Sequence, residues 1–289
     1  MQFAVLLQTL FYLYITMNKK PIILFKYGGN AMKDEENKKN VLSKIIDLKK
    51  QGFYVVISHG GGPFIKEILE ITKIKSEFID GQRYTTPEAF KYIEMVLKGQ
   101  VNSDLVNSIN ILGDKAVGLS GKDGKTVIAE KRKHQRLENG IMVDVDLGQV
   151  GNISSVNTEL IHILLENEFI PVIACIGSDE NGIAYNINGD TFAGALAGAL
   201  KADKFVVLTD VDGLLKDKDI PESIIRDIQL NDLKQLKENG IIQGGMIPKT
   251  EACETAIMLG AKSAKIINGT KPEQILEVQS KNTGTLITK

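Results

Sequence analysis

The sequence has no excess of charge of either sign and little cysteine. Its 289 residues include 35 lysines and arginines against 36 aspartates and glutamates, which gives a net charge of -1. This balance argues against a broad basic surface for nucleic acid or anionic membranes, so we expect neither partner. The two cysteines, Cys175 and Cys253, have neither CxxC spacing nor a nearby pair of histidines. We interpret them as buried thiols of a cytoplasmic protein and not as zinc ligands.

Three common catalytic or binding motifs are also absent. The chain has no GxxxxGK[ST] phosphate loop, no GxGxxG fingerprint after its first strands and no GxSxG nucleophile turn. The run HGGG at 59–62 is similar to an oxyanion-hole element of certain esterases, but Ser120, the nearest candidate nucleophile, lacks the closing glycine. We therefore expect nucleotide phosphates to be bound by another arrangement. His59 is interpreted as a structural or loop-positioning residue.

Residues 1–19 form an apolar N-terminal extension of uncertain status. The run is too short and too interrupted for a membrane span, which needs ~20 mostly apolar residues. It also lacks the positive start and the small-residue cleavage site of a signal peptide. Two interpretations stay open, a helix that packs on a partner subunit or an extension upstream of a native start at Met17. We favour the second slightly, because MNKKPIILFKYGG would be a natural opening for an α/β protein.

Apolar runs bounded by glycine alternate with amphipathic helices from residue 22 onward. Fully apolar strands separated by helices are typical of a parallel sheet covered on both faces, so the pattern predicts an α/β fold, a three-layer sandwich with a mainly parallel central sheet. No repeat or linker divides the chain, and two halves with a soft boundary near residue 180 are expected to share the sheet. The predicted strands span 22–27, 53–58, 116–120, 169–176, 204–209 and 263–268, and the predicted helices span 35–51, 63–73, 87–111, 157–167 and 191–201.

Residues 126–153 show short alternating segments instead. TVIAEKR and IMVDVD are separated by Glu138, Asn139 and Gly140, which predicts a hairpin inserted on the main sheet. Such a hairpin could serve as a lid or a flap on the substrate side.

Two predicted helices carry residues of one kind at helical spacing. Gly194 and Gly198 lie four apart, which predicts that helix 191–201 approaches a strand closely. The helix at 87–111 has an apolar face that is either part of the core or a dimer seam. That face consists of Phe90, Ile93, Val96 and Leu97.

Glycines and lysines follow the ends of the predicted strands. The first strand ends in KYGGN at 26–30, and the second leads through HGGG to Pro63 at a helix start. Free backbone amides, the helix dipole and a lysine ammonium can converge there on one anion. Because neighbouring parallel strands end at the same edge of a sheet, the two turns are expected to form one crevice. The later segments YNINGD, LTDVDG and QGGMIPK add amides, carboxylates and a second lysine at strand and helix ends.

In this order the motifs resemble those of the amino acid kinase family, and within it the acetylglutamate kinases. The resemblance runs from about Lys20 to the C-terminus through KYGGNAM, HGGGPFI, DGQRYTTPEAFKYIEMVLKGQVN, DLGQVG, YNINGD, LTDVDGLL and GGMIPK. It implies ATP-dependent phosphorylation of the side-chain carboxylate of N-acetyl-L-glutamate to N-acetyl-L-glutamyl 5-phosphate, a step of arginine biosynthesis. It also implies Mg²⁺ on the ATP phosphates, an acceptor and dimerisation lobe at 20–180, a nucleotide lobe at 181–289, and a homodimer or a higher oligomer.

The resemblance assigns roles to the residues at matching positions. Lys26 and Lys249 match two lysines that stabilise the transition state, and Asp190 matches the carboxylate that holds both. Gly28 and Gly29 match the turn that faces the γ-phosphate, and no protein cage is expected for the metal. The positions that match acceptor binding are Gly61, Gly62, Arg83 and Asn186. The positions that match nucleotide binding are Thr209, Asp210, Val211, Asp212, Gly213, Leu214, Leu215, Ile241, Ile242 and Gln243.

A related kinase is the alternative, one that acts on a carrier-linked aminoadipate or glutamate carboxylate. Arg83 and Asn186 would serve either acceptor, while the neutral charge balance and the GQRYTTPEAF segment favour the free acetylated amino acid. A catalytically inactive sensor of nucleotide or arginine has no support, since both lysines and Asp190 are present.

Overall fold

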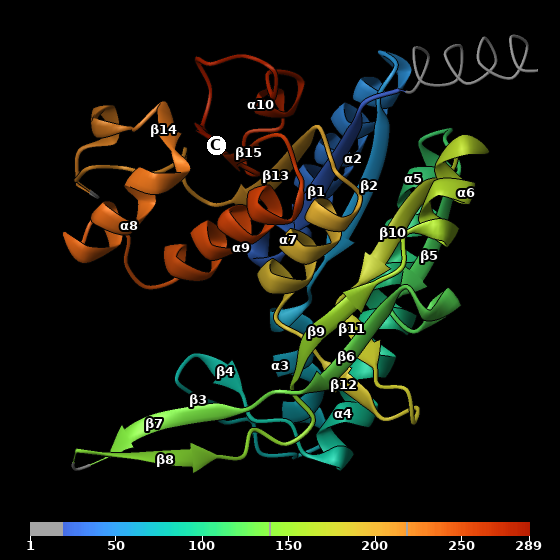
Figure 1. Cartoon of the computed structure of the whole chain (residues 1–289). Coiled ribbons are helices and arrows are strands. Elements are labelled where there is room, and N and C mark those ends of the chain that lie inside the picture. The colour runs from blue at the N-terminus through green and yellow to red at the C-terminus, as the bar shows by residue number, and fades with distance from the viewer. Residues whose placement is uncertain (1–19, 139, 218) are drawn as a thin grey trace, which may run out of the picture.

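The computed structural model of the chain describes residues 20–138, 140–217 and 219–289. One eight-stranded sheet forms its middle layer (Figure 1). All neighbouring strands are parallel except the pair β15 and β16. The order across the sheet is β14 (Asp227–Gln229), β16 (Thr285–Thr288), β15 (Ala264–Asn268), β13 (Lys204–Thr209), β1 (Ile22–Tyr27), β2 (Tyr54–His59), β10 (Ile170–Ala174) and β5 (Ala116–Ser120).

This sheet confirms the predicted α/β fold. All six predicted strands are part of it, because each is an apolar run with both faces buried or nearly so. Residues 20–180 supply β1, β2, β5 and β10, and residues 181–289 supply the other four strands. The division into an acceptor lobe and a nucleotide lobe stays a prediction. The interpretations of residues 1–19 fall outside the described residues.

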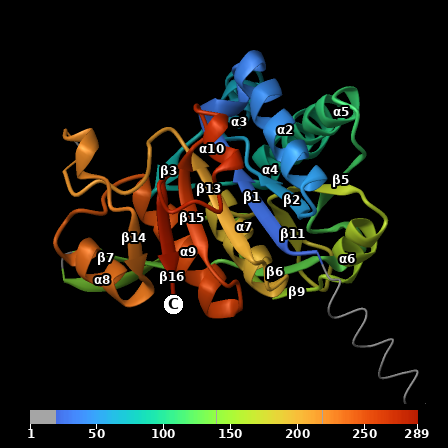
Figure 2. The same ribbon diagram turned by 90° about the horizontal axis from the view of Figure 1, so that it is seen from above.

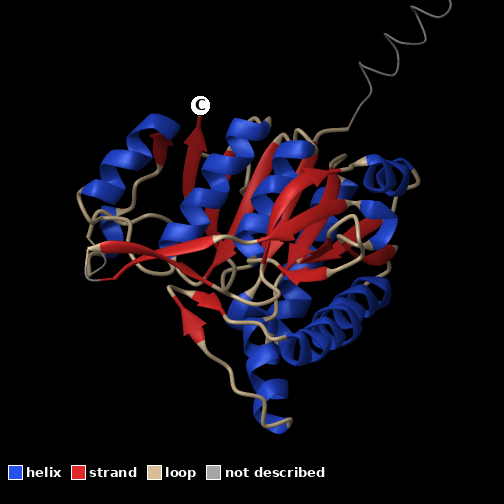
Figure 3. Ribbon diagram, turned by 60° about the horizontal axis from the view of Figure 1, so that its bottom comes forward, coloured by secondary structure: helices blue, strands red, loops and turns tan. Residues whose placement is uncertain are grey.

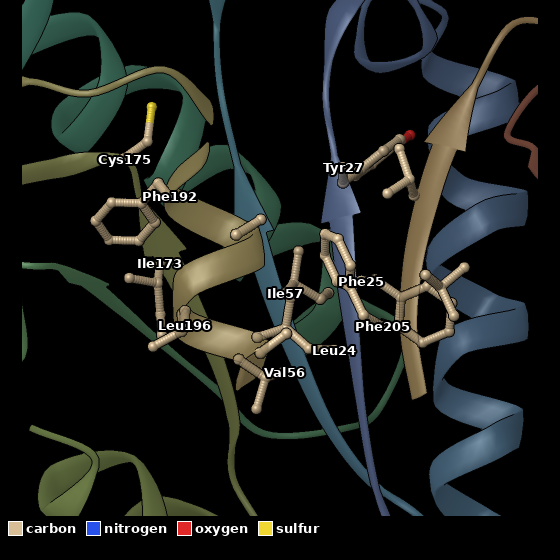
Figure 4. Packing of buried hydrophobic residues seen from close by; sticks show 14 of the residues in the cluster. Leu24, Phe25, Tyr27, Val56, Ile57, Ile173, Cys175, Phe192, Leu196 and Phe205 are labelled. Carbon is tan, nitrogen blue, oxygen red and sulfur yellow. The ribbon is translucent and has the colours of Figure 1, made fainter. Parts of the chain in front are cut away.

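Helices cover both faces of the sheet. Figure 2 shows α2 (Glu35–Lys50) and α10 (Glu273–Leu276) on one face, and α7 (Gly189–Ala199) and α9 (Met246–Leu259) on the other. Buried side chains from β1, β2, β10, β13 and α7 meet in the core (Figure 4), among them Leu24, Ile57, Ile173, Phe192 and Phe205. The remaining helices are α3 (Gly62–Ile71), α4 (Pro87–Glu94), α5 (Ser103–Ile111), α6 (Glu159–Glu166) and α8 (Leu230–Glu238). No helix in the described ranges is both long enough and apolar enough to span a bilayer.

The predicted helix at 87–111 has a π-helical middle. Residues Met95–Asn102 form this segment, η2, between α4 and α5. The spacing of apolar residues in the sequence did not indicate this change from an α-helix to a π-helix. The apolar face was predicted to be either part of the core or a dimer seam, and it is part of the core. Phe90, Ile93, Val96 and Leu97 are each at most 5% exposed and pack in the core cluster.

The predicted hairpin was placed wrongly in two respects. TVIAEKR contains β6 (Val127–Lys131), which pairs with β9 (Gly151–Val156) and not with IMVDVD. The partner of β8 (Ile141–Val145) is the unpredicted β7 (His134–Glu138), so the tip near Gly140 is correct; Asn139 lies outside the described residues. Neither pair joins the main sheet. The β7–β8 ribbon projects from the body (Figures 1 and 3), while β6 and β9 belong to a separate sheet with β11 (Ile176–Ser178) and β12 (Ala184–Asn186).

The small residues of α7 approach a helix, which corrects the predicted approach to a strand. A Cβ atom on Gly194 would lie 2.5 Å from the carbonyl oxygen of Ala252, and one on Gly198 would lie 2.4 Å from Cβ of Leu259. Both contacts are with α9. The spacing of four identified a close approach correctly, but because α7 and α9 cover the same face, the partner is the neighbouring helix.

Candidate active site

Two cavities open where β1, β2 and β13 end, and they share Lys26 and Gly28. The first, of about 410 Å³, which we call the β13 cavity, is also lined by Asp34, Thr209, Asp210 and Lys249. The second, of about 260 Å³, which we call the β12 cavity, is also lined by Gly60–Gly62, Arg83, Asn186, Asn188 and Asp190. The predicted crevice at the carboxyl ends of neighbouring strands is therefore present, and Lys26 stands between its two halves.

Lys26 and Asp190 form a buried ion pair at this junction. Lys26 is the fifth residue of β1, and its Nζ lies 3.0 Å from Oδ1 of Asp190 at the start of α7. Both residues are less than 10% exposed. Nζ of Lys26 and Oδ1 of Asp190 are not aligned as in a hydrogen bond, and Oδ1 accepts no hydrogen bond from the described residues. A buried pair of this kind holds the ammonium at one position while leaving it free to bond to a ligand.

Asn188, which was not among the predicted site residues, positions Asp190. Asn188 is the N-cap of α7, and its Oδ1 accepts hydrogen bonds from the backbone N of Asp190 at 2.9 Å and of Thr191 at 3.1 Å. Asparagine directly before a helix is a recognisable capping signal. The predicted start of the helix at residue 191 was two residues late, and this hid the signal.

Lys249 reaches the β13 cavity from the first turn of α9. Its Nζ donates to the carbonyl oxygen of Gly245 at 3.0 Å, and within the described residues it forms no ion pair. Asp190 thus contacts Lys26 but is not shown paired with Lys249, although the resemblance implies that it holds both. The two lysines nevertheless line one cavity.

The turn after β1 is built around its lysine. A Cβ atom on Gly28 would lie 2.9 Å from Nζ of Lys26, so a larger residue there would displace the ammonium. Gly29 begins the 3-10 turn η1 (Gly29–Met32). This contact explains why residue 28 is a glycine, while the role of the turn at the γ-phosphate stays a prediction.

The glycine loop after β2 forms one wall of the β12 cavity. Gly61 caps α3 and packs tightly, since a Cβ atom there would lie 2.6 Å from Cδ2 of Leu97. Gly62 has open space where its Cβ would be, and Pro63 occupies the first turn. Free amides at a helix N-terminus beside open space are suited to an anion.

Arg83 and Asn186 also line the β12 cavity. Arg83, on the two-residue strand β4 (Gln82–Arg83), stacks on Phe78 of β3 (Phe78–Ile79) at 4.5 Å from the ring centre, and also donates to the Ser76 hydroxyl. Burial lowers the pKa of Arg83, but a guanidinium stays charged at neutral pH. Asn186 ends β12, and its Nδ2 is 3.4 Å from Oγ1 of Thr85. A cation and an amide thus line the same cavity as the glycine loop.

The residues predicted to bind nucleotide are divided between two places. Thr209 and Asp210 line the β13 cavity, while a third cavity of about 520 Å³, the loop pocket, is lined by Val211, Gly213, Leu214, Leu215, Ile241 and Gln243. Asp212 and Ile242 line neither. The Asp212 carboxylate accepts from Asn268 at 2.8 Å and Lys271 at 2.7 Å, and its pKa is lowered chiefly by Lys271. Ile242 is 3% exposed within the core.

Known proteins identify the family. The sequence profile of the amino acid kinase family matches residues 21–268. The chain belongs to the amino acid kinase family. Acetylglutamate kinase of Methanocaldococcus jannaschii is 46% identical over 271 residues, which is 93% of this chain and 90% of that protein. Acetylglutamate kinase of Geobacter metallireducens is 46% identical over 257 residues, or 89% and 87%.

The fold comparison agrees. The solved structure of smu.665 from Streptococcus mutans has a TM-score of 0.74 and 28% identity, covering 92% of this chain and 98% of that one. The resemblance to amino acid kinases, and among them to acetylglutamate kinases, that the ordered motifs predicted is confirmed.

An amino acid kinase site of this geometry stabilises negative charge at the junction of the two cavities. Lys26 and Lys249 are cations, Asp190 contacts Lys26, and the His59 side chain is fully buried. The arrangement therefore suits a phosphoryl acceptor that needs no deprotonation, since positioning and charge stabilisation supply most of the catalysis in such transfers.

The carboxylates of the β13 cavity fit a hydrated magnesium ion. Asp34 and Asp210 line the same cavity as the two lysines, where bare phosphates would repel them. In the described parts of the chain no three His, Cys, Asp or Glu side chains cluster closely enough to hold a metal. Asp34 and Asp210 would thus contact the waters of a phosphate-bound ion, since Mg²⁺ usually keeps several waters.

Proposed function

We propose that this chain transfers the γ-phosphoryl group of ATP to the side-chain carboxylate of N-acetyl-L-glutamate, a step of arginine biosynthesis. One observation carries the proposal: the β13 and β12 cavities meet at Lys26 and Gly28. A nucleotide in the first cavity and a carboxylate in the second would thus approach each other beside one buried ammonium. The acetylglutamate kinases reported above, which match nearly the whole chain, support the choice of acceptor.

The acceptor side recognises an anion with a second polar end. The glycine loop offers backbone amides to the β12 cavity, and Arg83 offers a planar cation to it. Arginine grips a carboxylate with two parallel hydrogen bonds, so it would bind the α-carboxylate while the side-chain carboxylate points to Lys26. Asn186 would bind the acetamido group, because an amide side chain can both donate and accept.

The nucleotide side separates the phosphates from the base. The β13 cavity holds the cations and Thr209, which suits the phosphates, and the more apolar loop pocket suits the adenine. Magnesium, when bound on the phosphates, would neutralise part of their charge. The lysines act on the transferring group itself: Lys26 from the acceptor side and Lys249 from the nucleotide side would stabilise the charge that spreads over its oxygens.

A coupled assay of ADP release tests the proposal. N-acetyl-L-glutamate, glutamate, aminoadipate and carrier-linked glutamate or aminoadipate are offered at equal concentration with ATP and Mg²⁺. We expect turnover with N-acetyl-L-glutamate at least tenfold above the others, because a site built to pair polar groups rejects acceptors that leave them unpaired. Hydroxylamine trapping would verify that the product is an acyl phosphate. Turnover confined to a carrier-linked acceptor would replace this proposal with its alternative.

The homodimer and the cytoplasmic location are also proposals. Both cysteines are free and buried, and burial raises the pKa of Cys175 to about 12, so neither is suited to disulfide exchange. This supports a reducing compartment. A light-scattering mass of the purified protein tests the dimer, and a monomer at all concentrations would contradict it.

A further inference from the structure

The side chain of His59 is held at both of its ring nitrogens. Nδ1 lies 2.9 Å from the carbonyl oxygen of Gly60, and Nε2 lies 2.9 Å from Nδ2 of Asn102. His59 is fully buried and Asn102 is 2% exposed, so water does not compete for either bond. The pair links the glycine loop to the end of the π-helical segment η2.

The partners of Asn102 determine which nitrogen of His59 carries the proton. Nδ2 of Asn102 also lies 2.9 Å from the carbonyl oxygen of Val172, which can only accept. The NH₂ group of Asn102 must therefore point this way, and Nε2 of His59 must accept from it. Nδ1 then bears the hydrogen and donates to Gly60. Burial lowers the pKa of His59 to about 4, which keeps the ring neutral with this single hydrogen.

The π-helical geometry is what allows η2 to reach the loop twice. Leu97 packs at the Cα of Gly61, and Asn102 bonds to His59, five residues later. In an α-helix two residues five apart point about 140° away from each other. In a π-helix the backbone hydrogen bonds join residues five apart. The side chains of Leu97 and Asn102 therefore lie on nearly the same face. Gly118 completes the fit, because a Cβ atom there would be 2.0 Å from Oδ1 of Asn102.

We propose that Asn102 and His59 are positioning residues for acceptor binding: Asn102 holds the ring of His59 at Nε2, and His59 fixes the peptide between Gly60 and Gly61. In a trans peptide the N–H points opposite to the C=O. Holding the Gly60 carbonyl toward the core therefore directs the Gly61 N–H away from it, where the loop lines the β12 cavity. Three successive glycines have wide conformational freedom, so this loop needs such an anchor. The part that concerns the acceptor rests on the proposed function.

The first test reads the tautomer and needs no substrate. The chain has three histidines, and ¹⁵N NMR distinguishes Nδ1–H from Nε2–H in each. We expect His59 to be neutral with the hydrogen on Nδ1 from pH 6 to 8, the rarer form in solution. In Asn102→Leu, Nε2 loses its donor while Nδ1–H keeps its acceptor, so the ring is expected to stay Nδ1–H but to be held less firmly, with shifts of the Gly60–Gly62 amides. A wild-type ring with Nε2–H, or loop amides that do not move, would overturn the proposal.

The second test measures the effect on each substrate. Loss of one buried hydrogen bond should raise the KM for N-acetyl-L-glutamate about five- to tenfold in Asn102→Leu, with the KM for ATP changed less than about twofold. His59→Asn keeps a donor near the position of Nδ1, so it should stay closer to wild type than His59→Leu does. Leu105→Ala, at a buried position of α5, controls for general destabilisation and should leave both KM values unchanged.

The outcomes separate this inference from the proposed function. If the wild type does not phosphorylate N-acetyl-L-glutamate, the proposed function fails, and the tautomer and the loop amides still decide the positioning network. If the wild type is active and Asn102→Leu shifts the loop amides without raising the acceptor KM, the proposed function stands and the positioning role fails. Equal KM values for His59→Asn and His59→Leu would also contradict it.

Discussion

The Nζ atom of Lys26 and the Oδ1 atom of Asp190 lie 3.0 Å apart in the interior, joining the end of β1 to the start of α7. The pair is asymmetric in its surroundings, because the lysine faces both cavities and the aspartate lines only the β12 cavity. The carboxylate can therefore fix the ammonium while the cavities deliver two ligands to it. This arrangement explains why a buried cation is tolerated at the junction.

Removal of either lysine should slow catalysis far more than it changes folding. We expect Lys26→Ala and Lys249→Ala to lower kcat by roughly 10²-fold or more, as the loss of one preorganised charge typically does. The coupled ADP assay gives kcat, and circular dichroism checks the fold. Lys39→Ala, at an exposed position of α2, is the matched control and should behave as wild type. Near wild-type rates in Lys26→Ala or Lys249→Ala would refute the role of that lysine.

A methyl group at residue 28 should disturb the ammonium without removing it. In Gly28→Ala the new Cβ would lie 2.9 Å from Nζ of Lys26, so the ammonium must shift. A displacement of this size is expected to lower kcat by about 10²-fold. Gly99→Ala adds a methyl group to an exposed position with no heavy atom within 4 Å and should leave kcat unchanged. Equal activity of the two variants would contradict this account.

The order of strands and glycine turns could be predicted from the sequence because each depends on local chemistry. Apolar runs indicate the buried strands, and a lysine followed by paired glycines indicates the turn after β1. The crevice then follows from the rule that ligands bind at the carboxyl ends of parallel strands. The α/β fold could therefore be predicted from the sequence, and so could the placement of Lys26, Thr209 and the HGGG loop at one edge of the sheet.

Features that depend on contacts between residues far apart in the sequence could not be predicted from it. The π-helical segment η2 is stabilised by what it meets, Gly61 in the loop and Gly118 on β5, and neither contact has a local signal. The pairing of β6 with β9 skips the nearer segment, since register depends on the other strands of that sheet. The polar partners of Asp212 come from the end of β15 and the turn after it, so its absence from the lining of both nucleotide cavities could not be foreseen.

The contact between α7 and α9 should be intolerant of larger residues. In Gly198→Ala the added Cβ would lie 2.4 Å from Cβ of Leu259 and 3.0 Å from the carbonyl oxygen of Ala256. Overpacking typically costs about 1–3 kcal/mol, which exceeds the gain of about 1 kcal/mol in helix propensity. We expect a lower Tm, measured by calorimetry, with Gly99→Ala again as the control. A Tm at or above that of wild type would show that the two helices can separate without cost.

The buried lysine on β15 should make stability depend on pH in alkaline solution. Lys265 is fully buried, donates to the carbonyl oxygens of Glu277 at 3.0 Å and of Val278 at 3.4 Å, and lies near Lys204. Burial lowers the pKa of Lys265 from its ordinary value of 10.5 to about 8. Between these two pH values the unfolded chain binds more protons than the folded one, so the free energy of unfolding contributed by this group rises with pH.

Urea unfolding at pH 7, 8, 9 and 10 measures this contribution in the wild type and in Lys265→Met. The variant leaves the carbonyl oxygens of Glu277 and Ser280 without the Lys265 donor, so its absolute stability at pH 7 is not the relevant quantity. The relevant quantity is the difference in free energy of unfolding between the two proteins, because other groups that titrate in this range are common to both. We expect that difference to move in favour of the wild type as the pH rises from 8 to 10. A difference that stays constant would show that Lys265 keeps an ordinary pKa despite its burial.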